Sequence, residues 1–284
     1  MIRVISPGFL TSIQDLGRKG FANIGVPISG AMDHYSMKLA NNILHNNENE
    51  AVLEITFGHC KFVFEKETYI CISGADFSAE INKMPIVLNT VIKIFKDDVL
   101  SFGRHKFGVR SYISVLGGFQ TDVVLNSKSF YQGVTNFSIV KKGDLLPFNA
   151  PQDSLEPTYT AVKQNANHFN SKIIDCYKGP EYNLLSHFQK KRLEETIFTI
   201  AKANNRMAYQ LNETIENNLK SMLTSAVLSG TVQLTPSGQL IVLMRDCQVT
   251  GGYPRVLQLE NNAINMLSQK TTNDTVKFNV IDLN

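Results

Sequence analysis

Short runs of β-branched and aromatic residues, broken at close intervals by turn residues, dominate the first half of the chain. Such residues favour strands, and glycine, proline, asparagine or aspartate follows most of the runs. Many short strands at this spacing predict a mostly β fold, a barrel or sandwich, rather than a parallel sheet with alternating helices. The predicted strands of this half are residues 52–57, 61–65, 69–73, 77–81, 91–95 and 112–116.

A few helices interrupt this pattern. Asp33 is suited to cap a helix in which Met37, Ala40 and Leu44 recur at helical spacing. A second helix is expected after Gly179 and Pro180. Its apolar face would consist of Tyr182, Leu185 and Phe188. Strands are predicted in the second half at residues 172–177, 231–234, 240–244, 256–259 and 276–281.

The length of 284 residues favours two domains over one core. The strand pattern fades over residues 151–170, where proline, serine, threonine, glutamine and asparagine dominate, so this stretch is the predicted linker. We therefore expect an N-terminal β-barrel-like domain at residues 1–150 and a C-terminal one at residues 171–284.

Composition excludes several classes of protein. The formal net charge is +3 and neither half is strongly basic, so we expect no binding to nucleic acid or to an anionic membrane. The N-terminus lacks the apolar stretch of a signal peptide, and no apolar run is long enough to span a bilayer. Four scattered cysteines form no zinc or redox spacing, and the six histidines form no metal pattern. These features predict a cytoplasmic protein without a bound metal.

Residues 14–33 form the first segment that can carry chemistry, with four glycines placed just before the predicted helix. Glycine lets the backbone approach a ligand closely, and a helix N-terminus favours an anion. Asp15 and Arg18 can pair or face a common ligand, and Ser29 and Gly30 are candidate binding residues. The alternative is a long turn whose glycines only satisfy backbone dihedral angles. No P-loop spacing is present.

Residues 246–254 form the second segment, directly after a predicted strand. Asp246, Gln248 and Thr250 alternate, so an extended backbone would place their side chains on one face. Gly251 and Gly252 would then turn the chain and expose amide N–H groups. The alternative is a plain strand end followed by a tight turn.

Two isolated charged residues complete the candidates. Arg206 can hold a carboxylate or phosphate with two parallel hydrogen bonds, although a structural ion pair is the commoner fate of one arginine. Glu54 shares a strand face with Val52 and Thr56, and if buried it needs a partner. The alternative is that the Glu54 side chain points to solvent.

These segments resemble, in order, the conserved stretches of one family, the allophanate hydrolase subunit 2-like or biotin-dependent carboxyltransferase-like group. The similarity runs from about residue 3 to about residue 280. The matching stretches are residues 7–18 ("PGxxTTVQDxGR"), 25–33 ("GVPxSGAMD"), 53–58 ("LEITxGG"), 74–76 ("GAD"), 206–209 ("RMGY") and 246–254 ("DxQTTGGYP"). This chain departs from the pattern at His59, Ala208, Cys247 and Val249.

The resemblance implies two cyclophilin-like β-barrel domains. Stand-alone bacterial members of the family are the C subunits of 5-oxoprolinases, which implies a complex with a kinase-inhibitor-like B subunit and with the A subunit. Such a complex is an ATP-hydrolysing cyclic amidase that opens 5-oxo-L-proline to L-glutamate. ATP is then expected at the level of the complex, and the use of biotin stays open.

The resemblance also suggests roles for the candidate residues. Asp246, Gln248, Thr250 and the amides of Gly251 and Gly252 would orient the lactam and stabilise the developing oxyanion. Arg18 and Arg206 would hold the substrate carboxylate or a phosphate, while Asp15 or Glu54 would act as base. The remaining predicted binding residues are Ser29, Gly30, Tyr209 and Tyr253. Two other functions stay open: a carboxyltransferase acting from carboxybiotin on a urea-like substrate, and a non-catalytic antagonist that binds a kinase-inhibitor-like partner.

Overall fold

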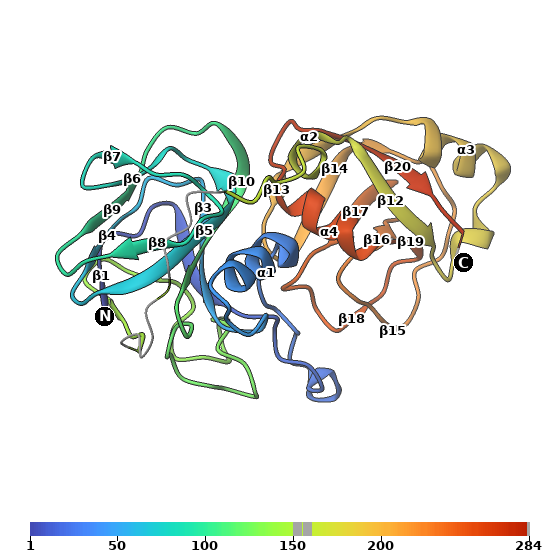
Figure 1. The fold of residues 1–284 in the computed structure, drawn as a ribbon. Coiled ribbons are helices and arrows are strands. Elements are labelled where there is room, and N and C mark those ends of the chain that lie inside the picture. Colours follow the sequence, from blue (N-terminus) through green and yellow to red (C-terminus); the bar gives the residue numbers. More distant parts are fainter. Residues whose placement is uncertain (150–154, 156–160, 283–284) are drawn as a thin grey trace. The chain divides into compact units, whose positions relative to one another are not determined.

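The computed structural model describes residues 1–149, 155 and 161–282, and in these residues the chain is mostly β with four α-helices (Figure 1). This confirms the predicted fold class. The chain divides into two compact units, one of Met1–Lys19 with Ser29–Asn165 and one of Gly20–Ile28 with Ala166–Asn284. Residues 150–154 and 156–160 of the predicted linker region lie outside the described residues, so the predicted domain limits stay a prediction.

The strands of the first unit form two sheets. The six-stranded sheet has the order β11 (Leu145–Leu146), β1 (Ile2–Ser6), β4 (Lys61–Phe64), β9 (Val99–Phe102), β6 (Ala79–Ile81) and β7 (Met84–Pro85). The five-stranded sheet has the order β2 (Leu10–Gln14), β3 (Val52–Thr56), β10 (Phe107–Val115), β5 (Thr68–Asp76) and β8 (Ile92–Ile94). The predicted short strands of this half are therefore confirmed, with ends shifted by a few residues.

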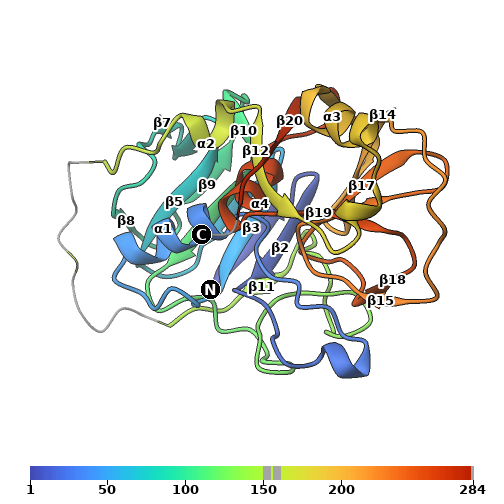
Figure 2. The same cartoon turned by 90° about the vertical axis from the view of Figure 1, so that its right-hand side faces the viewer.

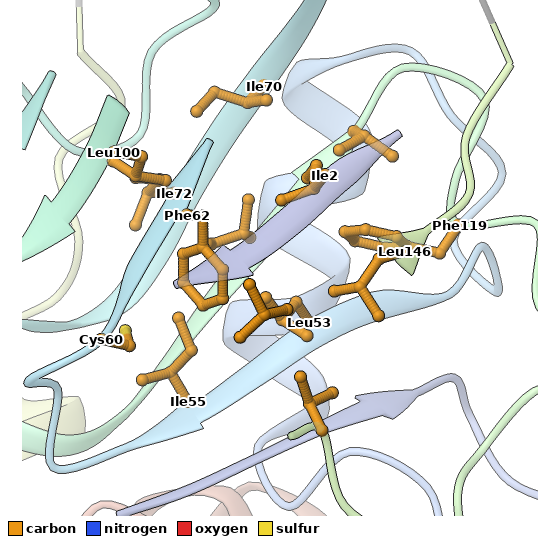
Figure 3. Close-up of a cluster of buried hydrophobic side chains, with 14 of the residues drawn as sticks. Ile2, Leu53, Ile55, Cys60, Phe62, Ile70, Ile72, Leu100, Phe119 and Leu146 are labelled. Atoms are coloured by element: carbon orange, nitrogen blue, oxygen red, sulfur yellow. The ribbon is translucent and has the colours of Figure 1, made fainter. Parts of the chain in front are cut away.

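A buried apolar cluster joins side chains from the two sheets (Figure 3). Ile2 and Phe62 come from the six-stranded sheet, whereas Leu53, Ile55 and Ile72 come from the five-stranded sheet. Burying a large aliphatic or aromatic side chain stabilises a fold by about 1.5–3 kcal/mol. The alternation of Leu53 and Ile55 with Val52 and Glu54 along β3 thus assigns one face of that strand to this core.

The helix α1 (His34–Ile43) packs on β5 and β10 of the five-stranded sheet (Figure 2). Asp33 caps it as predicted, because its carboxylate accepts hydrogen bonds from the Ser36 amide at 3.1 Å and from the Ser36 hydroxyl at 2.7 Å. Ala31, Met37, Val52 and Tyr112 form a small apolar cluster beneath the start of the helix. The face of β3 that bears Val52 and Glu54 is therefore covered rather than exposed to solvent.

The second unit contains a closed barrel of seven strands. Its order is β12 (Ile173–Lys178), β19 (Arg255–Leu259), β16 (Thr231–Leu234), β17 (Gln239–Leu243), β14 (Ala208–Thr214), β13 (Phe198–Asn204) and β20 (Thr275–Val280). Pairing is antiparallel throughout, except where β12 and β20 pair in parallel and close the barrel. The small strands β15 (Ser225–Ala226) and β18 (Thr250–Gly251) form a separate pair.

The helix predicted after Pro180 is wrong in its extent. A short 3-10 turn, η2 (Tyr182–Leu184), ends before Leu185, and α3 (His187–Glu195) begins anew with Ser186 as its N-cap. The Ser186 and Gln189 side chains form a capping box that fixes this second start. Phe188 is consequently 70% exposed and does not share a face with Tyr182. The remaining helical elements are η1 (Ala22–Ile24), α2 (Asn167–Asn170) and α4 (Asn261–Ser268).

The four cysteines, Cys60, Cys71, Cys176 and Cys247, are free and buried. Burial raises the pKa of each thiol, to about 11 for Cys247 and to about 12 for Cys71 and Cys176. These thiols are therefore protonated at neutral pH and unreactive. In the described part of the chain, every helix is too short or too polar to cross a bilayer.

Candidate functional site

Asp15 lies just after β2, and its carboxylate is buried and surrounded by donors. Oδ1 accepts hydrogen bonds from the Gly17 amide at 2.7 Å, the Ser127 hydroxyl at 2.7 Å and the Ser129 hydroxyl at 2.6 Å. Oδ2 accepts one from the Lys128 amide at 2.6 Å. A base would have to release some of these bonds to accept a proton, so the contacts of Asp15 favour an anchoring role for residues 127–129.

The neighbouring polar side chains of the same segment hold the same stretch of chain. Arg18 is fully buried and donates a hydrogen bond from Nη2 to the Ser129 carbonyl. Gln14 donates from Nε2 to the Phe130 carbonyl at 3.3 Å and to the Ser12 hydroxyl at 2.9 Å. With Asp15, these residues tie the end of β2 to residues 127–130, a role that their sequence spacing did not indicate.

Gly30 explains one of the glycines in residues 14–33. Its φ of 92° lies in the left-handed region, and a Cβ there would come within 2.8 Å of the Gly17 nitrogen and 2.9 Å of the Asp15 carbonyl oxygen. The Ala31 amide donates to that same Asp15 carbonyl at 2.8 Å. Ser29, beside it, is fully buried with a φ of 59°. Gly30 therefore allows two stretches of backbone to touch.

Glu54 is buried and bonded rather than pointing to solvent. Its Oε2 accepts hydrogen bonds from the Met32 amide at 2.7 Å and from the Tyr112 hydroxyl at 2.9 Å, and its Oε1 lies 4.0 Å from Arg110 Nε. The Asp33 amide in turn donates to the Tyr112 hydroxyl oxygen at 2.8 Å. Burial, together with the charges of Glu54 and Asp33, raises the pKa of Tyr112 well above its ordinary value, so Tyr112 donates as a neutral phenol.

This network bears on the predicted anion-binding loop. The amides of Met32 and Asp33 are already bound by Glu54 and Tyr112, and the Ser36 amide is bound by Asp33. The Ser36 amide, in the first turn of α1, therefore already donates to an acidic side chain of this chain, Asp33. The anion-binding role proposed for residues 14–33 stays a prediction, and the contacts at this helix start favour the alternative of a structural turn.

Arg206 and Asp246 meet in the second unit. Arg206 lies before β14 and Asp246 after β17, and the two strands pair with Ala208 opposite Leu243, which brings these residues together. The guanidinium binds the carboxylate in a fork, with Nε to Oδ2 at 2.8 Å and Nη2 to Oδ1 at 2.9 Å. The side chains are 11% and 16% exposed. The two candidates thus form one element, an ion pair near the surface.

The backbone around Asp246 is a turn and not an extended strand, so the expected single face of alternating side chains is wrong. The Asp246 amide donates to the Arg206 carbonyl at 2.9 Å, and the Cys247 amide donates to the Met244 carbonyl at 3.1 Å. Only Thr250 and Gly251 are in a strand, paired with β15. The turn and the Arg206–Asp246 ion pair occur together, since the Asp246 backbone and side chain both bind Arg206.

Beyond the turn, the segment offers exposed polar groups. Gln248, Thr250 and Tyr253 are exposed, and Gly252 is held through its carbonyl, which accepts a hydrogen bond from the Met222 amide at 2.8 Å. A Cβ on Gly251 would lie 2.5 Å from Gln233 Nε2, so any larger residue there would require the Gln233 side chain to move. An amide, a hydroxyl and a phenol at the surface suit recognition of a polar ligand by hydrogen bonds.

Tyr209, in contrast, is used inside its own unit. It is buried in β14, and its hydroxyl donates to the Lys270 carbonyl at 3.2 Å. The Lys270 ammonium itself donates to the Phe169 carbonyl at 3.3 Å, and burial lowers its pKa. Tyr209 therefore joins β14 to the residues that come after α4.

The sequence did not identify the partners of the two buried carboxylates. Tyr112 and Arg110 lie two residues apart on β10 and so share a face with each other, but the predicted strand began only at Tyr112. Ser127 and Ser129 lie in a loop without periodicity, where no sequence pattern points to Asp15. In the described residues, no cluster of three or more metal-binding side chains occurs.

Comparison with known proteins gives one consistent family. The carboxyltransferase domain family, subdomains A and B, matches residues 24–280. The chain is 31% identical to the 5-oxoprolinase C subunit of Escherichia coli over 263 residues, which covers 90% of this chain and 83% of that protein. It is 27% identical to the 5-oxoprolinase C subunit of Haemophilus influenzae over 289 residues, which covers 100% of this chain and 92% of that protein.

A solved structure supports the same grouping. The crystal structure of the K. lactis urea amidolyase superposes with a TM-score of 0.88 at 26% sequence identity and covers 99% of this chain. The chain spans only 19% of the length of that protein. Both units are therefore represented in one part of a much longer protein.

Proposed function

This chain belongs to the carboxyltransferase domain family, subdomains A and B, and on that premise we propose that it is the C subunit of an ATP-dependent 5-oxoprolinase complex. The observation that carries the proposal is the extent of the similarity to the two bacterial C subunits. It covers 90% and 100% of this chain, and so includes residues of both compact units. The complex would add water to the lactam carbonyl of 5-oxo-L-proline, break the ring C–N bond and release L-glutamate.

The exposed part of residues 246–254 is the proposed place where this chain contacts the substrate. A lactam is resonance-stabilised, so its opening needs donors aimed at the oxygen on which negative charge develops. Gln248 and Thr250 have exposed donors of this kind, and Tyr253 adds a third. We assign these three side chains to binding and orienting the amide group.

The Arg206–Asp246 ion pair is the proposed positioning element. It holds the turn that leads to Gln248 and Thr250, through two side-chain bonds and one backbone bond between the same two residues. A geometry fixed to within a fraction of an ångström is what productive binding requires. Asp15 and Glu54, which were candidate bases, are better suited to holding the first unit together.

ATP is proposed to enter with another member of the complex. The start of α1, with Asp33 bound to the Ser36 amide, does not fit a triphosphate, because the anion position there is taken by this chain's own carboxylate. No step through ATP is therefore assigned to residues of this chain. The proposed partners are the kinase-inhibitor-like B subunit and the A subunit of the 5-oxoprolinase.

Reconstitution tests this function directly. The chain is mixed with candidate A and B subunits, and glutamate release from 5-oxo-L-proline is measured with and without ATP. Release that requires all three proteins and ATP is the expected result. A mixture of the A and B subunits that releases glutamate equally well without this chain would contradict the proposal.

A second candidate is a carboxyltransferase that acts from carboxybiotin on a urea-like substrate. The similarity in fold to the urea amidolyase of K. lactis, over 99% of this chain, favours it. Biotin carboxylase, a biotinylated carrier protein and urea replace the A and B subunits in the matching assay. Urea-dependent consumption of carboxybiotin in that assay, with no glutamate release in the first, would select this candidate. Tight binding of the B subunit without turnover in either assay would instead indicate a non-catalytic antagonist.

A further inference from the structure

A cavity of about 260 Å³ lies in the first unit, and none of the candidate site residues lines it. Its lining consists of residues 120–122, 124, 130, 135–137 and 144–147, and the last of these stretches includes β11 at the edge of the six-stranded sheet. This volume lies just below the range of about 300–1,000 Å³ that is typical of small-molecule sites, so the cavity has room only for a compact ligand. We call it the Asp122 pocket.

The floor and wall of the Asp122 pocket are apolar. Phe130 and Leu146 are buried members of the core, and Leu146 is seen at the edge of that cluster in Figure 3. Phe137 packs its ring against Phe130 with centroids 6.0 Å apart, yet remains 54% exposed. An exposed aromatic ring beside a cavity is surface that a bound ligand would remove from water.

The charge of the Asp122 pocket is opposite to that of the chain. Asp122 and Asp144 belong to its lining, which contains no lysine, arginine or histidine among the described residues, whereas the whole chain has a net charge of +3. The Lys141 amide donates to Asp144 Oδ2 at 2.7 Å, which fixes the orientation of that carboxylate. The Thr121 hydroxyl is buried and has no hydrogen-bond partner within the part of the chain that the structure describes. A ligand that donates hydrogen bonds would find acceptors in the Asp122 and Asp144 carboxylates.

We propose that the Asp122 pocket binds a small organic cation, a primary ammonium attached to an aromatic or branched alkyl body. The body packs against Phe130, Phe137 and Leu146, and the ammonium lies at the Asp122 and Asp144 carboxylates. A close pairing of opposite charges over an apolar floor gives both orientation and selectivity against anions. The inference is independent of the proposed ring-opening activity, because it uses none of the residues assigned to that reaction.

A series of three ligands with the same ring tests the charge. 2-Phenylethylamine, 2-phenylethanol and phenylacetate are titrated into the full chain at low salt, and binding is followed by calorimetry and by NMR shifts of the lining leucine and valine methyl groups. The amine is expected to bind best, the alcohol more weakly and the carboxylate least, with the advantage of the amine reduced at high salt. Equal affinity for the amine and the carboxylate overturns the proposal, as does the absence of any shift at millimolar amine.

Two variants localise the site. Asp122→Asn is expected to weaken amine binding about two- to fivefold, as for a solvent-exposed ion pair, and to leave alcohol binding unchanged. Glu67→Gln removes an exposed carboxylate outside the Asp122 pocket and is the matched control, for which no change is expected. Val124→Trp is expected to fill the pocket and abolish binding of both ligands, with an unchanged thermal unfolding midpoint as the check on folding. Amine affinity that is identical in wild type and Asp122→Asn would contradict the assigned location.

Discussion

The two units use carboxylates in opposite ways. In the first, Asp15 is buried and accepts four hydrogen bonds, one from Gly17 and three from partners more than 100 positions later in the chain. In the second, Asp246 is near the surface, has one forked partner in Arg206 and precedes a run of exposed polar side chains. Asp15 and Asp246 both lie in segments that the sequence alone marks as candidate sites, residues 14–33 and 246–254. The number of donors, together with the exposure of the neighbouring side chains, distinguishes a carboxylate that holds the fold from one that positions a site.

Removal of the buried carboxylate is the strongest test of this comparison. Asp15→Ala leaves two hydroxyl groups and two backbone amides without their acceptor, and we expect it to lower the unfolding free energy by about 3–5 kcal/mol. Urea denaturation measures the loss. Asp122→Ala is the control, since it removes an exposed aspartate and should change stability by less than about 0.5 kcal/mol. Similar unfolding midpoints for the two variants would break the comparison.

Removal of the Asp246 carboxylate should lower enzymatic activity more than it lowers the stability of the fold. Asp246→Ala is expected to lower glutamate release by the reconstituted complex about 100-fold, equivalent to about 2.7 kcal/mol, while destabilising the chain much less than Asp15→Ala does. Arg206→Lys should lose most of this activity too, because an ammonium cannot form the fork. A variant that unfolds like Asp15→Ala but keeps its activity per folded molecule would reverse the two assignments.

Substitution at the close backbone contact of Gly30 should lower stability by less than Asp15→Ala does, and Gly20 offers a matched control. Gly20 has a similar φ, 94° against 92°, but a Cβ on it would have nothing within 4 Å. Gly20→Ala should cost only the strain of a positive φ, about 1 kcal/mol, whereas Gly30→Ala should cost about 2 kcal/mol more. Thermal unfolding of both variants measures the difference. Equal costs would mean that the contact between residues 15–17 and 30 is not tight.

The exposed side chains of the second unit should affect substrate binding with no effect on folding. Gln248→Ala and Thr250→Val are each expected to lower kcat/KM for 5-oxo-L-proline about tenfold, or about 1.4 kcal/mol. Their unfolding midpoints should match wild type, because both side chains are exposed. Unchanged kinetics in both variants would remove residues 246–254 from the substrate contact while leaving the role of Asp15 untouched.

A second forked pair in the same unit extends the comparison to pH. Arg255 donates from Nε and Nη2 to Glu181 at 2.9 and 2.8 Å, and these bonds hold the pKa of Glu181 below its ordinary value of 4.5. The pair therefore adds stability above pH 4.5, and this contribution is lost as the pH falls through the lowered pKa. Glu181→Gln should be less stable than wild type by at most about 1 kcal/mol at neutral pH, with the difference vanishing in acid. A stability difference between Glu181→Gln and wild type that stays the same at every pH would contradict this role of the ion pair.

Many of the strands and the first helix could be predicted from the sequence because their signals are local, whereas β1, β2, β9, β13 and β14 were not predicted. Residues 52–56 are rich in β-branched residues and Asp33 is a good helix cap, so β3 and α1 appear as expected. The partners of Glu54 and Asp15 could not be predicted, because they depend on which strands pair and on a loop more than 100 residues away. The single face expected for Asp246, Gln248 and Thr250 failed for the same reason. The segment is a turn in which Asp246 binds Arg206, a partner 40 residues earlier in the chain that no local pattern indicates.

The parallel pairing of β12 with β20 has a consequence for synthesis of the chain. The barrel is closed by its first and last strands, Ile173–Lys178 and Thr275–Val280, so it cannot be completed before residue 280 has been made. The strands of the first unit are all present once Leu146 has been made. Because domains generally fold in the order of translation, the first unit is free to fold on the ribosome while the second waits. During that interval β12 lacks its parallel neighbour, and its unpaired backbone edge is open to pairing with other chains.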